Sequence, residues 1–85
     1  MSYDVVWDNK AINFLHKLDP FIAKRIIKLV KSFSKDPRTK QFKKLTNENV
    51  FRLRAGNYRI LFNFNQKTQT INILEIGHRK NIYKN

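Results

Sequence analysis

The residues best suited to chemistry lie in the C-terminal part of this sequence, and most of them are cationic. Arg52, Arg54 and Arg59 fall within one short stretch, and His78 and Tyr83 follow near the end of the chain. A guanidinium binds phosphate oxygens through paired hydrogen bonds and keeps its charge near neutral pH. A histidine transfers protons near pH 7, and a tyrosine stacks on a base. Metal-free RNA cleavage needs a base for the 2′-OH, cations at the phosphate and a proton donor for the 5′-oxygen, and these residue types offer a candidate for each role.

The three arginines are expected on one β-hairpin, because the segments on either side of residues 55–56 alternate apolar and polar side chains. A loop centred there predicts Arg52 directly opposite Arg59. Like charges opposite each other across two strands cost about 0.2–1 kcal/mol, so this pair predicts a bound anion such as a phosphate. The alternative is that Glu48 or Glu75 neutralises one arginine and solvent covers the others. The pairs expected on the core side are Leu53 with Tyr58 and Phe51 with Ile60.

The overall charge also indicates a polyanionic partner. The chain carries 18 Lys and Arg against 6 Asp and Glu, a formal charge of +12, with a pI near 10.4. Residues 1–23 hold only two of these basic residues and three of the acidic ones, so the excess lies in residues 24–85. Nucleic acid is the most common partner of so basic a domain, ahead of anionic lipid or an acidic protein. The sequence has no cysteine and two histidines, which excludes thiolate metal centres and disulfide scaffolds, and we expect no cofactor.

The elements that position these residues can be read from the hydrophobic period. Residues 3–7 are predicted to form a strand, and apolar residues at helical spacing predict two helices, over residues 11–18 and 20–33. Asp19-Pro20 is the start signal of the second helix, and Asp36-Pro37 is the stop signal that follows it. Residues 37–48 are predicted to form a loop. Three strands then follow, at residues 50–54, 57–64 and 70–76. The sequence therefore predicts a single α+β domain over residues 1–85, in which two N-terminal helices pack on one face of a four-stranded, mainly antiparallel sheet and leave the other face open.

Two further groups of cations stand outside the hairpin. The second helix carries Lys24, Lys28, Lys31 and Lys35 on one face, which is either a track for phosphates or an ordinary solvated surface. The predicted loop carries basic side chains as well, at Arg38, Lys40, Lys43 and Lys44. The N-terminus lacks the basic and apolar regions of a signal peptide, and no apolar run approaches the ~20 residues of a membrane span, so a cytoplasmic location without membrane contact is expected.

Two motifs resemble those of a known family. The segment Phe51-Arg52-Leu53-Arg54 followed by Gly56-Asn57-Tyr58-Arg59-Ile60, together with Ile76-Gly77-His78-Arg79 and Tyr83, resembles the RelE/ParE toxin superfamily over nearly the whole chain, and its RelE-like branch in particular. The resemblance implies the β-α-α-β-β-β fold and a toxin of a type II toxin–antitoxin system. In the RelE branch it implies a ribosome-dependent, metal-free endoribonuclease that cleaves mRNA in the A site. Attack by the 2′-OH would leave a 2′,3′-cyclic phosphate and a 5′-OH.

Roles for individual residues follow from the same resemblance. Arg52, Arg54, Arg59 and Arg79 match basic positions of the RelE-type site, and Tyr83 matches the C-terminal tyrosine that stacks on an mRNA base. RelE has lysines at the first two positions, one of them proposed as general base, and an arginine, which keeps its proton near neutral pH, cannot take that role. By analogy with relatives that use a C-terminal histidine, the resemblance implies His78 as the candidate for proton transfer. The expected catalytic residues are Arg52, Arg54, Arg59, His78, Arg79 and Tyr83, and those expected to bind RNA are Lys43, Lys44, Arg52, Arg54, Arg59, Lys80 and Tyr83.

The resemblance leaves other functions open. The ParE branch shares the fold but inhibits DNA gyrase and lacks most of this basic set, and a non-catalytic nucleic-acid-binding module would need only the cations and the tyrosines. The partners implied are a RelB-like antitoxin, the ribosome and mRNA. Because phosphate binding needs accessible guanidinium groups, we expect Arg59 and Arg79 to be exposed.

Overall fold

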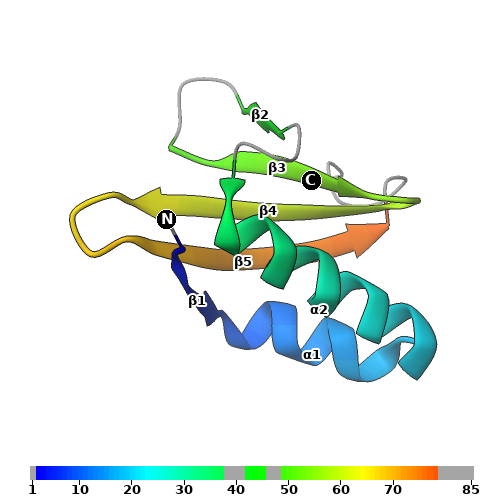
Figure 1. The fold of residues 1–85 in the computed structure, drawn as a ribbon. Helices are drawn as coiled ribbons and strands as arrows, with labels where there is room; N and C mark the ends of the chain where they lie inside the picture. The colour runs from blue at the N-terminus through cyan, green and yellow to red at the C-terminus, as the bar shows by residue number, and fades with distance from the viewer. Residues whose placement is uncertain (1, 38–41, 46–48, 79–85) are drawn as a thin grey trace.

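Two helices lie on one face of a five-stranded mixed sheet in the computed structural model, which describes residues 2–37, 42–45 and 49–78 (Figure 1). The strand order is β1-β5-β4-β3-β2, with β1 parallel to β5 and the other neighbours antiparallel. This confirms the predicted α+β class, with one strand more than the four expected. The elements in chain order are β1 (Asp4–Trp7), α1 (Asn9–Lys17), α2 (Pro20–Lys35), β2 (Phe42–Lys44), β3 (Phe51–Ala55), β4 (Tyr58–Asn65) and β5 (Thr70–His78).

Both helices begin where an aspartate caps them. The Asp8 carboxylate accepts a hydrogen bond from the backbone N–H of Lys10 at 3.1 Å, and the Asp19 carboxylate accepts one from the N–H of Phe21 at 2.8 Å. Pro20 then occupies the first turn of α2, where its missing N–H costs nothing. These caps explain why the two helices start where the sequence indicates. In the described part of the chain, no helix is long and apolar enough to cross a lipid bilayer.

An aromatic cluster joins α2 to the sheet. The Phe33 ring, fully buried on α2, makes an edge-to-face contact with Phe62 on β4, with ring centroids 5.1 Å apart. Phe42 and Phe51 extend the cluster towards β2 and β3. Such pairs add about 0.5–1.5 kcal/mol each beyond the area they bury. The sheet is thus held firmly against the helices on one face. The remaining buried apolar side chains are Ala11, Leu15, Ile26, Val30, Leu53, Ile60, Ile71, Ile73 and Ile76.

The fifth strand, β2, corrects the prediction of a loop over residues 37–48. Phe42 pairs with Leu53, Lys43 with Arg52 and Lys44 with Phe51. A strand of three residues is too short to show a period of two, so alternation could not reveal it. Its cause is the Phe42 side chain, whose ring lies 5.4 Å from that of Phe33 and draws the segment onto the edge of the sheet.

Candidate functional site

The turn between β3 and β4 sets which cations face each other. Gly56 has a φ of 60°, and the loop consists of Gly56 and Asn57, with Ala55 paired to Tyr58. Glycine adopts this left-handed conformation without strain, whereas alanine does not, so Gly56 takes the first loop position. The predicted loop at residues 55–56 is therefore wrong by one position, and the register shifts by two residues. The observed pairs are Leu53 with Ile60, Phe51 with Phe62, Arg52 with Leu61 and Arg54 with Arg59.

Four cations nevertheless share one face of the sheet. Arg54 lies directly opposite Arg59, and Arg52 lies directly opposite Lys43 on β2. Arg52 and Arg54 are two positions apart on β3, so all four side chains belong to the face turned away from the core residue Leu53. The register thus gives two like-charge pairs in place of the single pair predicted. We call Lys43, Arg52, Arg54 and Arg59 the cationic face.

The cationic face is compact enough to hold a nucleotide backbone. Strands in a sheet lie about 4.8 Å apart and rise about 3.4 Å per residue, so Lys43 on β2 and Arg59 on β4, two strands across and two residues along, are separated by about 12 Å at the backbone. Lys43 and Arg54 are exposed, and Arg52 is half-buried. Guanidinium groups at these positions suit a phosphate, whose oxygens accept paired hydrogen bonds from them. Lys44, predicted alongside Lys43, is opposite Phe51 and belongs to the other face.

Arg59 differs from the expectation of an exposed side chain, since only 6% of its surface is accessible. Its Nη1 group donates to the carbonyl oxygens of Gly56 at 3.3 Å and Tyr58 at 3.2 Å. On the neighbouring strand, the position opposite Arg59 is Gly77, which has no side chain. The guanidinium is consequently held at the hairpin turn instead of extending into solvent.

His78 is set apart from the cationic face. It pairs with Tyr58 across β4 and β5, whereas Arg59 pairs with Gly77, so His78 and Arg59 belong to opposite faces of the sheet. The rings of His78 and Tyr58 are in edge contact with centroids 5.5 Å apart, and Tyr58 in turn contacts Phe14 of α1. The predicted grouping of His78 with the C-terminal residues cannot be followed further, because Arg79, Lys80 and Tyr83 lie outside the described residues, as do Arg38, Lys40 and Glu48.

The carboxylate of Glu75, considered as a partner for an arginine, forms its ion pair with Lys10, the Nζ and Oε1 atoms being 3.3 Å apart. Lys10 is 69% exposed and the Glu75 side chain 33%, so this pair contributes little to stability. Glu75 lies beyond the end of β1, because the last pair of β1 with β5 is Trp7 with Ile73. On the other side of β5 the register shifts, since Leu61 pairs with Glu75 and the next residue, Phe62, pairs with Ile73. Among the described residues, no group of three or more metal-ligating side chains is present.

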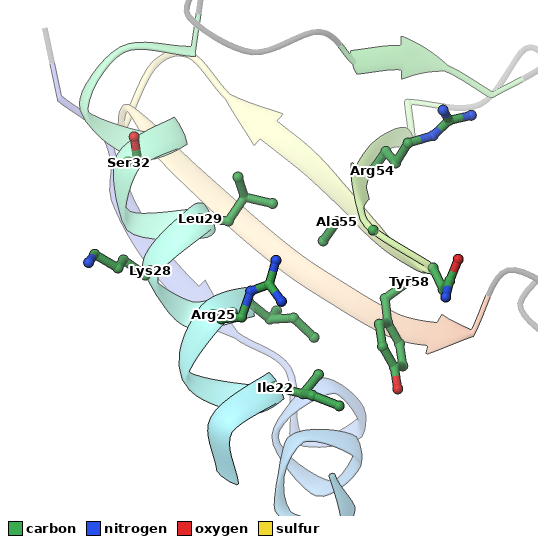
Figure 2. Close-up of a pocket in the computed structure, with 11 residues that line it drawn as sticks. Ile22, Arg25, Lys28, Leu29, Ser32, Arg54, Ala55 and Tyr58 are labelled. Carbon is green, nitrogen blue, oxygen red and sulfur yellow. The ribbon is translucent and has the colours of Figure 1, made fainter. Parts of the chain in front are cut away.

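A groove on the helix side of the sheet was not predicted. It has a volume of about 800 Å³ and runs between α2 and the β3–β4 turn (Figure 2). Ile22 and Leu29 of α2 point into it from one wall, and the Tyr58 ring lines the other. Arg25 points from α2 towards the sheet. The sequence signal that could have pointed to Arg25 is its place directly after Lys24, on the predicted helix that carries the four lysines. The groove is thus an apolar channel with cations at its rim, the lining residues being Ile22, Arg25, Ile26, Lys28, Leu29, Ser32, Arg54, Ala55, Gly56, Asn57 and Tyr58.

Known proteins match this chain in sequence and in fold. The family model described as "ParE toxin of type II toxin-antitoxin system, parDE" matches residues 5–83. Toxin RelG of Mycobacterium tuberculosis is 32% identical over 87 residues, covering 99% of both chains. The toxin-antitoxin complex RelBE2 of the same organism contains a chain 30% identical, with a TM-score of 0.83 and 93% of each chain covered. A chain of the archaeal RelE-RelB complex of Pyrococcus horikoshii has a TM-score of 0.79 at 23% identity, covering 95% and 99% of the two chains. This chain therefore belongs to the RelE/ParE family, as a RelE-like toxin of a type II toxin–antitoxin system.

Proposed function

We propose that this toxin is a ribosome-dependent endoribonuclease that cleaves mRNA in the A site without a metal ion. The observation that carries the proposal is the cationic face, in which Arg54 opposes Arg59 and Lys43 opposes Arg52. Four cations gathered on one face of the sheet attract a polyanion, and guanidinium groups suit the phosphodiester. The resemblance implies that the gyrase-inhibiting branch lacks most of this set.

The proposed reaction is a transesterification. The 2′-OH loses its proton to a general base and its oxygen attacks the neighbouring phosphorus, while the bond from phosphorus to the 5′-oxygen breaks and that oxygen takes up a proton. The products are a 2′,3′-cyclic phosphate and a 5′-OH. The guanidinium groups of Arg52, Arg54 and Arg79 would stabilise the extra negative charge on the phosphoryl oxygens, and Tyr83 would stack on a base. Arg59, which is buried at the turn, would support them through its charge and not by extending to the phosphate.

His78 is proposed as the proton-transfer group. His78 is the last residue of β5, and its side chain belongs to the face opposite Arg59. It would therefore reach the RNA around the end of the sheet. Lys44 and Lys80 are proposed to contact the RNA backbone. These roles place the bound strand across the ends of β3, β4 and β5, not along the middle of the sheet.

A RelB-like antitoxin is the proposed protein partner. The RelBE2 complex, with a chain 30% identical to this one, is a toxin–antitoxin assembly, which supports the proposal. The groove beside α2 offers an apolar channel bordered by Arg25, Lys28 and Arg54, and a segment that alternates apolar and acidic side chains would complement it.

The test is a cleavage assay on translating ribosomes, in which primer extension maps mRNA ends produced by wild type and by Arg54→Gln. Arg54 is exposed, so the variant should fold. Cuts within the A-site codon by wild type, reduced in Arg54→Gln, are expected. Lys67→Gln, which removes one charge from the β4–β5 turn, is the matched control. A DNA supercoiling assay with gyrase, run on the same preparations, tests the ParE alternative. Gyrase inhibition without mRNA cleavage would overturn the proposal.

A further inference from the structure

The outer face of α2 carries four lysines, of which only Lys28 also borders the groove. Lys24, Lys28, Lys31 and Lys35 are all exposed and follow one another at intervals of four, three and four residues. At 100° per residue these positions fall within a sector of about 60°. Figure 2 shows Lys28 pointing away from the sheet, whereas Leu29 points towards it. We call these four residues the lysine stripe.

The lysine stripe is unusual in having no neutralising charge on its own helix. The sequence of α2, PFIAKRIIKLVKSFSK, contains no acidic residue, and no ion pair joins a lysine of the stripe to a described residue. Neighbours in the stripe are three or four residues apart, and such like-charge pairs destabilise a helix by about 0.2–0.5 kcal/mol each. Helices exposed only to water commonly mix the two signs and gain from i,i+4 pairs. The stripe therefore opposes helix formation in the free protein, as the cationic face opposes pairing of its strands.

The lysine stripe is also too far from the cationic face to serve the same anion. The buried residues Ile26, Val30 and Phe33 turn the opposite side of α2 to the sheet, so the stripe faces outward from the helix layer. The cationic face belongs to the far side of the sheet. The molecule measures 33 × 28 × 23 Å, and charges on opposite sides are separated by more than the Debye length of about 8 Å at physiological salt. An anion bound at one of these two surfaces would therefore not compensate the charge of the other.

We infer that the lysine stripe binds the phosphate backbone of a double-helical RNA, at a site separate from the strand to be cleaved. The inference rests on the proposed function and adds a contact to it. When bound to the ribosome, the toxin would also contact structured RNA through the lysine stripe. From Lys24 to Lys35 the helix rises about 16 Å, which spans several phosphates of one strand. Lysine contacts to phosphates position a protein without reading sequence, so binding should depend on salt and not on base identity.

The experiment measures the affinity of the full chain for a labelled RNA hairpin of about 20 base pairs, by fluorescence anisotropy at several salt concentrations. One variant, Lys24→Gln/Lys31→Gln, removes two charges from the stripe and leaves Lys28, which borders the groove, unchanged. The matched control, Lys17→Gln/Lys67→Gln, removes the same charge from exposed lysines on α1 and on the β4–β5 turn. Each lost phosphate contact lowers the slope of log K against log [salt] by about 0.9, so the stripe variant should lose about 1.8 units and bind roughly 30-fold more weakly at 0.15 M salt. The control should lose less than half a unit.

Equal losses in the two variants would overturn the inference, because net charge alone would then explain binding. Weaker binding of an antitoxin by the stripe variant, with RNA affinity unchanged, would also overturn it by assigning the stripe to a protein partner. Circular dichroism of both variants establishes that α2 is retained. The cleavage assay on ribosomes is read separately, so a toxin that cuts no mRNA but shows the selective loss of RNA affinity refutes the proposed function and leaves this inference standing.

Discussion

Removing one charge from the Arg54–Arg59 pair should make the protein more stable and less active at once. Arg54 is exposed and lies directly opposite Arg59. Like-charge pairs at this position cost about 0.2–1 kcal/mol, and solvent screening at Arg54 favours the lower half of that range. For a domain of this size, 1 kcal/mol corresponds to about 4–8 °C in Tm. Arg54→Gln should therefore raise Tm by about 1–4 °C while it lowers mRNA cleavage.

The assay is thermal unfolding followed by circular dichroism, with and without inorganic phosphate. Phosphate should stabilise wild type more than Arg54→Gln, because a ligand raises stability by RT ln(1 + [L]/Kd) only where its site is intact. Lys67→Gln controls for the change in net charge and should respond to phosphate as wild type does. A Tm for Arg54→Gln equal to or below that of wild type, together with an unchanged response to phosphate, would refute the argument that the pair is an anion site.

Three further predictions concern stacking, proton transfer and the core. Tyr83→Ala should lower transition-state binding by about 1–3 kcal/mol through lost stacking, whereas Tyr83→Phe should retain most cleavage; equal losses would assign the hydroxyl a role instead. His78→Gln should reduce the single-turnover cleavage rate by about 10²–10⁴-fold with RNA affinity unchanged, and a rate equal to wild type would exclude His78 from proton transfer. Phe33→Ala removes a fully buried ring at the centre of the aromatic cluster. It should lower the free energy of unfolding by about 3–5 kcal/mol in urea titration, and a loss below 1 kcal/mol would contradict the packing described.

The sequence predicts most of the fold because its signals are local. The Asp19-Pro20 start signal and the hydrophobic periods place both helices and four of the sheet's strands within one or two residues of their observed ends. β2 could not be predicted in this way, because its three residues are held by the long-range contact of Phe42 with Phe33. A tertiary contact of this kind leaves no periodic trace in the sequence.

Although the predicted register was wrong, the three hairpin arginines still fall on one face of the sheet, for a geometric reason. The loop was misplaced by one residue, which changes the sum of paired positions by two and keeps every side chain on its own face. The partners changed, so that Arg54 and not Arg52 faces Arg59. A change of one in that sum would have placed the Arg59 side chain on the core side of the sheet. The separation of His78 from that face was not predicted, because the predicted strand ended at residue 76 and only the observed pairing of Tyr58 with His78 shows which face His78 belongs to.

The burial of Arg59 links the geometry of the turn to the candidate site. Its Nη1 donates to the carbonyl oxygen of Gly56, whose positive φ sets the direction of that carbonyl. An arginine extended into solvent loses up to about 2 kcal/mol of side-chain entropy when a ligand fixes it, whereas one already held by the turn has lost most of that freedom on folding. The hairpin therefore holds the Arg59 guanidinium in place behind the exposed Arg54. In the proposed site Arg54 would contact the phosphate, and Arg59 would add a positive charge whose position the turn has already fixed.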